Sequence, residues 1–425
     1  MTASLVVIAI PAWGSEPATF RVSTASDGGE ANHGSSFPSI SADGRFVAFS
    51  SPASNLTLDD VNGVPDVFVH DLQNGTTSLA SVSSDGLPGD RVSRFPSMSA
   101  DGRFVAFESE ATNLVPRDTN GAPDIFVRDL QAGVTVRVSV KSNGTQVRRG
   151  GFFPKVSADG NTIGFQSFAT KLVPGDTNGN NDSFVHSLQT GETTRVSVAS
   201  DGSEANGNSF TPRLSADGHL VSFASQASNL VSDDGNARGD VFLHDLHTRQ
   251  TTLVSVASDG GAANGESSFS SLSPDGRFVA FTSLADDLVL GDTNGTRDVF
   301  VRDLQTGETT RASVASGGAE SDGPSDSSAA SLSADGRFVS FTSFASNLVV
   351  GDTNEVRDAF VHDRQTRETM RVSVDSGGIE ANMGSRQYCV ISADGRFVAF
   401  PSDATNLVSS DLNDAPDIFE RGPLF

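Results

Sequence analysis

A repeat of about 58 residues constrains the fold of this chain most strongly. The sequence Ser-Ala-Asp-Gly-Arg-Phe-Val-Ala-Phe at Ser41 to Phe49 returns in varied form, with its Asp at positions 43, 101, 159, 217, 275, 335 and 394. A second Asp follows each of these by 23 residues, at positions 66, 124, 182, 240, 298, 358 and 417. Seven units therefore share one internal geometry, and this outweighs the two or three domains that 425 residues would otherwise suggest.

Each unit has the pattern of four short strands. The first strand ends three residues before the turn Asp, as at Ile40, and an Asp-Gly turn leads to the second, Phe46 to Phe49. That second run is apolar at successive positions, which is typical of a strand covered on both faces. The third strand begins at the second Asp, as in Asp66 to His70, and another turn leads to the fourth, such as Thr193 to Val198.

Seven units of four antiparallel strands predict an all-β fold, a seven-bladed β-propeller. An open stack of sheets would leave two exposed edges. The seventh unit ends after its third strand, Asp417 to Glu420, and Thr19 to Thr24 resembles a fourth strand placed before the first unit. We therefore expect the N-terminal strand to complete the last blade and close a single propeller domain over residues 18–425.

The first 17 residues are predicted to be a leader. An apolar run from Leu5 to Ile10 is short for a signal peptide and has no basic segment before it, so a signal-peptide remnant and a disordered leader both remain open. No stretch of eighteen apolar residues occurs, so no transmembrane helix is expected.

The repeat also resembles a known family. The Ser-x-Asp-Gly-Arg-Phe-Val-Ala-Phe segment followed by Asp-Val-Phe-Val-x-Asp-Leu is similar to the WD-repeat-like propeller repeat of TolB and its relatives, from about Thr19 to Glu420. The resemblance implies a propeller and an exported protein, periplasmic or extracellular, although a cytoplasmic location stays open. It does not imply one activity, because such blades serve scaffolds, peptidases and lyases. TolB has fewer blades and an additional N-terminal domain, so no role in the Tol system follows.

Composition excludes several classes of function. The net charge of -24, from 53 acidic and 29 basic residues, is opposite in sign to that of a nucleic-acid binder. The single cysteine, Cys389, excludes an internal disulfide framework and a multi-cysteine metal site. The sequence contains no nucleophile elbow, metalloprotease helix motif, phosphate loop or dinucleotide fingerprint. We therefore expect a non-enzymatic protein.

The long connections of each unit are predicted to share one face of the ring. They run from the second to the third strand and from the fourth strand to the next unit, and we call the surface they form the long-loop face. Each loop between the second and third strands carries the motif Asp-x-Asn-Gly-x-x-Asp or a close variant. Short oxygen-bearing side chains at this spacing suit Ca²⁺, and Asx turns are the structural alternative. The candidate ligands are Asp60, Asn62 and Asp66, Asp118, Asn120 and Asp124, Asp176, Asn178 and Asp182, and Asp292, Asn294 and Asp298, with Asp176 and Asp292 in the most complete loops.

The first strands are expected to approach the central channel. Lys155 and Arg213 fall in neighbouring units at one position, and Tyr388 lies in an aromatic column beside them. With Arg148 and Arg149, these cations predict a pocket for an anionic ligand, against the alternative of scattered solvated charges. A column of His and Arg in the third strands, such as His70 and Arg128, is interpreted as ion pairing or solvation at the strand ends.

Three functions follow from these patterns. The first is a monomeric binding or scaffold protein that contacts a protein or other macromolecule through the long-loop face, with calcium stabilising that face. The second is a lyase or hydrolase at the channel mouth, with Lys155, Arg213, Tyr388 or His33 as participants. The third is a carbohydrate-binding propeller, which one Trp and one Tyr make less favourable.

Overall fold

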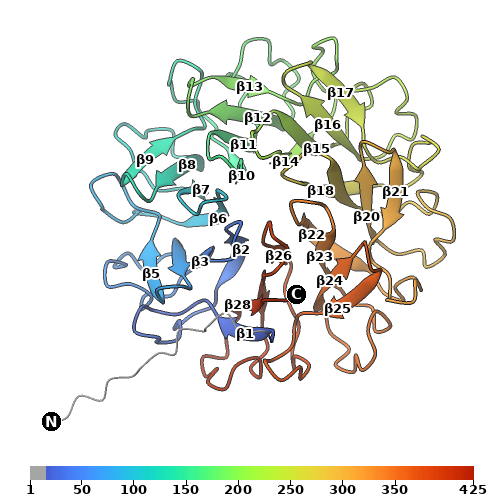
Figure 1. The fold of residues 1–425 in the computed structure, drawn as a ribbon. Coiled ribbons are helices and arrows are strands. Elements are labelled where there is room, and N and C mark those ends of the chain that lie inside the picture. The colour runs from blue at the N-terminus through green and yellow to red at the C-terminus, as the bar shows by residue number, and fades with distance from the viewer. Residues whose placement is uncertain (1–15) are drawn as a thin grey trace.

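The computed structural model describes residues 16–425 and consists of seven sheets arranged in a ring (Figure 1). Each sheet has four antiparallel strands, and within the described residues every regular element is a strand. The all-β, seven-bladed propeller predicted from the repeat is confirmed. The predicted leader lies mostly outside the described residues. Within residues 16–425, no helix is long and apolar enough to span a lipid bilayer.

The blades are numbered from the first complete unit, and the innermost strand of each is its first strand (Figure 1). Blades 1 to 3 contain β2 (Ser36–Ile40), β3 (Phe46–Ser51), β4 (Asp66–Asp71) and β5 (Thr76–Leu79); β6 (Ser93–Met98), β7 (Phe104–Ser109), β8 (Asp124–Asp129) and β9 (Val134–Arg137); and β10 (Phe152–Val156), β11 (Thr162–Ser167), β12 (Asp182–Ser187) and β13 (Thr193–Arg195).

Blades 4 to 6 contain β14 (Ser209–Leu214), β15 (Leu220–Ser225), β16 (Asp240–Asp245) and β17 (Gln250–Leu253); β18 (Ser267–Leu272), β19 (Phe278–Ser283), β20 (Asp298–Asp303) and β21 (Glu308–Arg311); and β22 (Ser325–Leu332), β23 (Phe338–Ser343), β24 (Asp358–Asp363) and β25 (Glu368–Arg371). Blade 7 contains β26 (Val390–Ile391), β27 (Val398–Ser402), β28 (Asp417–Gly422) and β1 (Ala18–Arg21).

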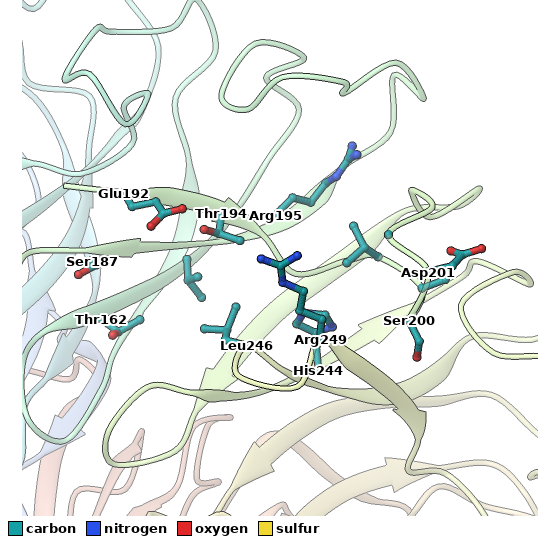
Figure 2. A pocket seen from close by; sticks show the side chains of 14 residues that line it. Thr162, Ser187, Glu192, Thr194, Arg195, Ser200, Asp201, His244, Leu246 and Arg249 are labelled. Carbon is teal, nitrogen blue, oxygen red and sulfur yellow. The ribbon is translucent and has the colours of Figure 1, made fainter. Parts of the chain in front are cut away.

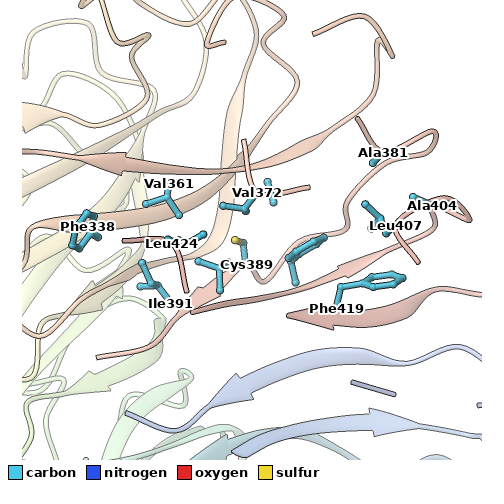
Figure 3. Packing of buried hydrophobic residues seen from close by; sticks show 13 residues of the cluster. Phe338, Val361, Val372, Ala381, Cys389, Ile391, Ala404, Leu407, Phe419 and Leu424 are labelled. Atoms are coloured by element: carbon cyan, nitrogen blue, oxygen red, sulfur yellow. The ribbon is translucent and has the colours of Figure 1, made fainter. Parts of the chain in front are cut away.

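The N-terminal strand closes the ring, as the sequence predicted. β1 pairs with β28 in antiparallel register, with Ala18 opposite Gly422 and Arg21 opposite Phe419. A further main-chain hydrogen bond joins Val22 N to Ile418 O at 2.7 Å. On the other side of blade 7, Figure 3 shows the chain end packed into a cluster between blades 6 and 7, where Leu424 lies near Cys389. Both ends of the chain therefore join the same blade.

The Asp-Gly-Arg-Phe turn holds neighbouring blades together. Arg45 donates to Asp71 through two hydrogen bonds of 3.0 and 2.8 Å, and its guanidinium lies 4.6 Å from the centre of the Phe46 ring. That ring packs against Gly102 in the same turn of the next blade, where φ is +72°. A Cβ atom at Gly102 would collide with the ring, so this glycine is required both by backbone conformation and by packing.

The histidines in the column of the third strands are buried, so the interpretation as solvated or ion-paired strand ends is wrong for them. His186 is buried, and its Nδ1 lies 2.8 Å from Thr193 Oγ1. Because the Thr193 hydroxyl donates to Val140 O of the preceding blade, His186 Nδ1–H is the donor in this pair. Burial lowers the pKa of His186 to about 4. His186 is thus neutral, and it supports the threonine that contacts the preceding blade.

Removal of β1 tests ring closure. A chain beginning at Thr24 lacks the pairing with β28 and the fully buried Val22. The loss of one strand pairing and one buried valine costs on the order of several kcal/mol of unfolding free energy. We expect the melting midpoint to fall by several degrees, measured by calorimetry. A chain beginning at Glu16 retains β1 and should melt as the full chain does, and equal melting of both truncated chains would contradict closure by β1.

The pH dependence of stability tests the neutral histidines. Because the pKa of His186 is about 4 in the folded chain and about 6.5 when unfolded, the unfolded state binds the proton first. Acidification from pH 6.5 to 4 should therefore remove up to about 3 kcal/mol of stability through this residue. The variant His186→Arg, which copies Arg128 of blade 2, should lose less stability over this window in denaturant unfolding.

The control for this experiment is His33→Arg, at an exposed position. It should keep the pH dependence of the unaltered protein. Buried carboxylates with raised pKa values contribute the opposite slope, but they are common to all three proteins and cancel in the comparison. An identical pH slope for His186→Arg and the unaltered protein would show that His186 is not held neutral.

Candidate functional site

The first strands bend where they reach the channel mouth on the long-loop face. The pairing of β2 with β3 shifts register between Ser36 and Ser39, and similar irregularities occur in blades 2 to 6. At the bends of blades 1 to 5, and at the matching position of blade 7, a residue other than glycine has a positive φ: Phe37, Phe95, Phe153, Thr211, Phe269 and Tyr388, between 45° and 77°. This conformation is strained for bulky residues, and such strain concentrates at ligand sites.

Four of these strained residues form a continuous aromatic wall. The ring centres of Phe37 and Phe95 lie 4.3 Å apart, and those of Phe95 and Phe153 lie 4.5 Å apart. Tyr388 meets Phe37 edge-on at 5.0 Å. The rings therefore support one another from blade 7 through blades 1 and 2 to blade 3, which stabilises the strained backbone.

A cavity of about 360 Å³ opens at the end of this wall. Lys155, Arg213 and Tyr388 all line it, so the structure brings together the three ligand-binding residues predicted from the sequence. Arg297 and Glu266 also line it. The other predicted participants do not: Arg148, Arg149 and His33 are exposed and are not among the residues lining this cavity.

The cavity is positively charged within an acidic molecule. Arg213 donates from Nε to Ser270 O at 3.1 Å, and burial lowers the pKa of its guanidinium to about 10. Burial raises the pKa of Tyr388, and the nearby Arg213 opposes this shift. Arg297 donates to Ser268 Oγ at 2.8 Å. Lys155, Arg213 and Arg297 thus line the cavity together with Glu266.

Two polar side chains hold the strained backbone from the neighbouring blade. Gln166 Oε1 accepts the main-chain N–H of Thr211 at 2.9 Å, and Glu108 Oε2 accepts that of Phe153 at 3.3 Å. Sequence reasoning missed Gln166, Glu108 and Arg297. Gln166 and Glu108 stand at one repeat position near the end of the second strand, where polar residues interrupt an apolar run.

The Asp-x-Asn-Gly-x-x-Asp loops make the hydrogen bonds of the structural-turn alternative. In blade 1, Asn62 Oδ1 accepts the N–H of Val64 at 2.9 Å, and Asn62 Nδ2 donates to Asp66 and to Gly89 O. The asparagines of the other predicted loops, Asn120, Asn178 and Asn294, bond in the same way. The side-chain oxygen of each asparagine is therefore engaged in a turn.

An arginine from the fourth strand lies against the carboxylates in five of the seven loops. In blade 3, Arg195 Nη1 lies 3.5 Å from Asp176 Oδ1, 3.6 Å from Asp182 Oδ2 and 2.9 Å from Glu204. Arg311 contacts Asp292, Asp298 and Glu320 in blade 5, and Arg137 contacts Asp118 and Asp124 in blade 2. Burial raises the pKa of Asp176 and of Asp292 to about 6. The two loops with the most complete motif already contain a cation.

A second hollow of about 580 Å³ lies between the outer strands of blades 3 and 4. Figure 2 shows Arg249 reaching into it, while Arg195 points away toward the loops where its carboxylate partners lie. His244 in its wall is bonded to Thr251. Both His244 and Arg195 already bond to residues that recur in the repeat. This outer groove is therefore a weaker candidate site than the central cavity.

Blade 4 also departs from the repeat on the opposite face. His219 replaces the arginine of the Asp-Gly-Arg-Phe turn, and its ring stacks on that of His247 with centres 4.7 Å apart. Asp245 lies near both rings. One ligand atom from each of these three residues lies within 4.8 Å of the other two, so the three could bind one metal ion.

Comparison with solved structures supports the fold. The chain superposes on an oligogalacturonate lyase in complex with manganese with a TM-score of 0.55 and 12% identity, covering 96% of this chain and 90% of that chain. The β-propeller domain of the Trilobed protease from Pyrococcus furiosus gives 0.54 and 12%, covering 88% and 90%. At these identities the likeness concerns the propeller fold alone.

The propeller that the resemblance to TolB implied is present in this chain's own fold. TolB from Acinetobacter baumannii gives a TM-score of 0.43 and 15% identity, and the chain covers 63% of that TolB chain. No protein-family model and no curated protein matches the sequence.

Proposed function

We propose that this propeller is a non-enzymatic binding protein whose long-loop face engages a partner that places a carboxylate group in the central cavity. The observation that carries the proposal is the cavity itself, in which Lys155, Arg213 and Arg297 converge in a molecule with a net charge of -24. A cleft lined by one sign of charge concentrates ligands of the opposite sign. Guanidinium groups also match the planar geometry of a carboxylate.

The composition of the cavity supports a ligand that is both apolar and anionic. Phe95, Phe153 and Phe269 supply apolar surface, and Tyr388 adds a hydroxyl beside Arg213. Binding sites commonly combine apolar walls with a few fixed polar groups. The aromatic wall fixes these groups before a ligand arrives, which reduces the entropy lost on binding.

Exposed apolar residues on the same face support a macromolecular partner. Leu58 of blade 1, Leu290 of blade 5 and Val350 of blade 6 stand two residues before the first Asp of their loops and are almost fully exposed. Leu412 of blade 7 is exposed in the corresponding loop. Blades 5, 6, 7 and 1 are consecutive in the ring, so these residues extend along one arc of the long-loop face. We further propose that the protein acts as an exported monomer.

Calorimetric titration with a short acidic peptide tests this function, with its amidated, uncharged counterpart as the ligand control. We expect Lys155→Gln and Arg213→Gln each to weaken binding at least about tenfold, or about 1.4 kcal/mol, because each removes a cation from the cavity. The matched protein control is Lys171→Gln, an exposed lysine outside the cavity. Equal affinity of all variants, or equal binding of the uncharged peptide, would overturn the proposal.

A lyase is the second candidate, because Tyr388 and Lys155, two groups able to transfer a proton, face the same cavity as Arg213. In β-elimination a base removes the proton next to a uronate carboxylate, a carbon–carbon double bond forms, and the carbon–oxygen bond breaks as the leaving oxygen is protonated. Arg213 would neutralise the carboxylate, and Lys155 and Tyr388 would transfer the protons. The similarity in fold to an oligogalacturonate lyase makes an oligogalacturonate the test substrate.

Turnover distinguishes the two candidates. The double bond formed by elimination absorbs ultraviolet light, so product appears directly in a spectrophotometer. The binding proposal predicts no product from oligogalacturonate. Product that is lost in Lys155→Gln and retained in Lys171→Gln would replace the binding proposal with the lyase.

A further inference from the structure

Two blades lack the arginine that neutralises the loop carboxylates elsewhere. In the strand pairing, Leu79 of blade 1 and Leu253 of blade 4 occupy the position of Arg195, each opposite a phenylalanine of the third strand. The acidic partner of that arginine is also replaced: Pro88 and Ala262 stand at the bridge position of Glu204. Blades 1 and 4 have thus lost both members of an ion pair that blades 3, 5, 6 and 7 keep.

The same two loops carry an additional carboxylate. The residue before the first loop Asp is Asp59 in blade 1 and Asp233 in blade 4, whereas it is Arg117, Gly175, Gly291, Gly351 or Ser410 in the other blades. Negative charge has therefore been added where the internal cation is absent. Without compensation, both changes would destabilise the folded chain by like-charge repulsion.

The first loop carboxylate of these two blades has no cationic partner among the described residues. Asp60 is only 6% exposed, and its Oδ1 is buried without a hydrogen bond or ion pair. The corresponding Oδ1 atoms of Asp118, Asp176 and Asp292 face the arginines of their blades at 3.2, 3.5 and 3.1 Å. In blade 4 both oxygens of Asp234 are buried, and the carboxylate has the main-chain N–H of Asn236 near it but no cation. A buried, unpaired carboxylate is costly, so these atoms point to a cation.

We propose that blades 1 and 4 each bind a calcium ion at the position that an arginine guanidinium occupies in the other five blades. Asp60 and Asp66 hold the ion in blade 1, and Asp234 and Asp240 hold it in blade 4. The main-chain carbonyl before the first Asp, which accepts from Arg195 at Gly175, is a further oxygen ligand. All the metal-ligand atoms are oxygens, which hard cations prefer, and water completes the coordination.

Calcium fits these loops better than magnesium does. Magnesium demands near-ideal octahedral geometry, whereas calcium accepts irregular arrangements and longer distances. In blade 1, a hollow of about 660 Å³ lined by Asp59, Thr77 and Leu79 lies next to this loop. With few protein oxygens, the affinity belongs in the range of extracellular calcium modules, about 10⁻⁴ to 10⁻³ M.

Counting bound ions tests the proposal directly. Equilibrium dialysis of the chelator-treated full chain against ⁴⁵Ca²⁺ should give two ions per chain, with little competition from equal magnesium. Leu79→Arg should remove one ion and the double variant Leu79→Arg/Leu253→Arg both, because the guanidinium then occupies each site as it does in five blades. Asp60→Asn should also remove one ion.

Asp176→Asn is the matched control, since it alters the same repeat position in a loop that already contains Arg195. It should leave the count at two. No bound calcium at 10-fold excess over the expected dissociation constant, seven ions, or an unchanged count in the Leu→Arg double variant would each overturn the proposal. The arginine substitutions copy a pattern that the repeat already uses, and melting in chelator verifies that they fold. None of these outcomes depends on ligand binding in the central cavity.

Discussion

One buried carboxylate in each blade holds the repeat together. Asp66 begins the third strand of blade 1, accepts the Ser81 hydroxyl of the fourth strand at 2.6 Å and accepts Asn62 of the long loop. Ser81 Oγ in turn accepts the N–H of Val67, so one group ties two strands to a loop. In blade 7 the same bond runs from Ser23 to Asp417 and joins the two ends of the chain. Because a buried charge needs these partners, the spacing of 15 residues from this Asp to its serine recurs in blades 1 to 6.

This constraint explains where the blades have diverged. The Asp that begins the third strand occurs in every blade. Its second carboxylate oxygen faces a residue of the fourth strand, and that residue is arginine in five blades and leucine in two. A change there alters local charge without disturbing the sheet, because Leu79 and Arg195 sit at the same register. The loops are therefore the part of each blade that can acquire a new partner while the ring stays intact.

The sequence was sufficient to predict the fold and the grouping of three residues that line the central cavity. Regular spacing predicted the strands, and the unmatched segment near Arg21 predicted closure. Lys155, Arg213 and Tyr388 were predicted to converge because first strands must line the axis. The contacts of the fourth-strand arginines with the loop carboxylates were not predicted, because these contacts are tertiary. The bend at Phe37 was also unpredictable: a positive φ at a phenylalanine is set by the packing of Phe95 and Tyr388 around it, which no local pattern reveals.

The acidic surface around the cavity and the cations inside it together limit which ligands the cavity can bind. The surface is strongly acidic, so an anionic ligand is repelled at a distance, but at physiological salt this repulsion is screened beyond about 8 Å. Lys155, Arg213 and Arg297 act only within that range, beside the aromatic wall. A ligand with charge spread along its length meets the acidic rim repeatedly, whereas one with a single terminal carboxylate on an apolar stem meets it once. The geometry therefore favours recognition of an end group over recognition of a polyanion.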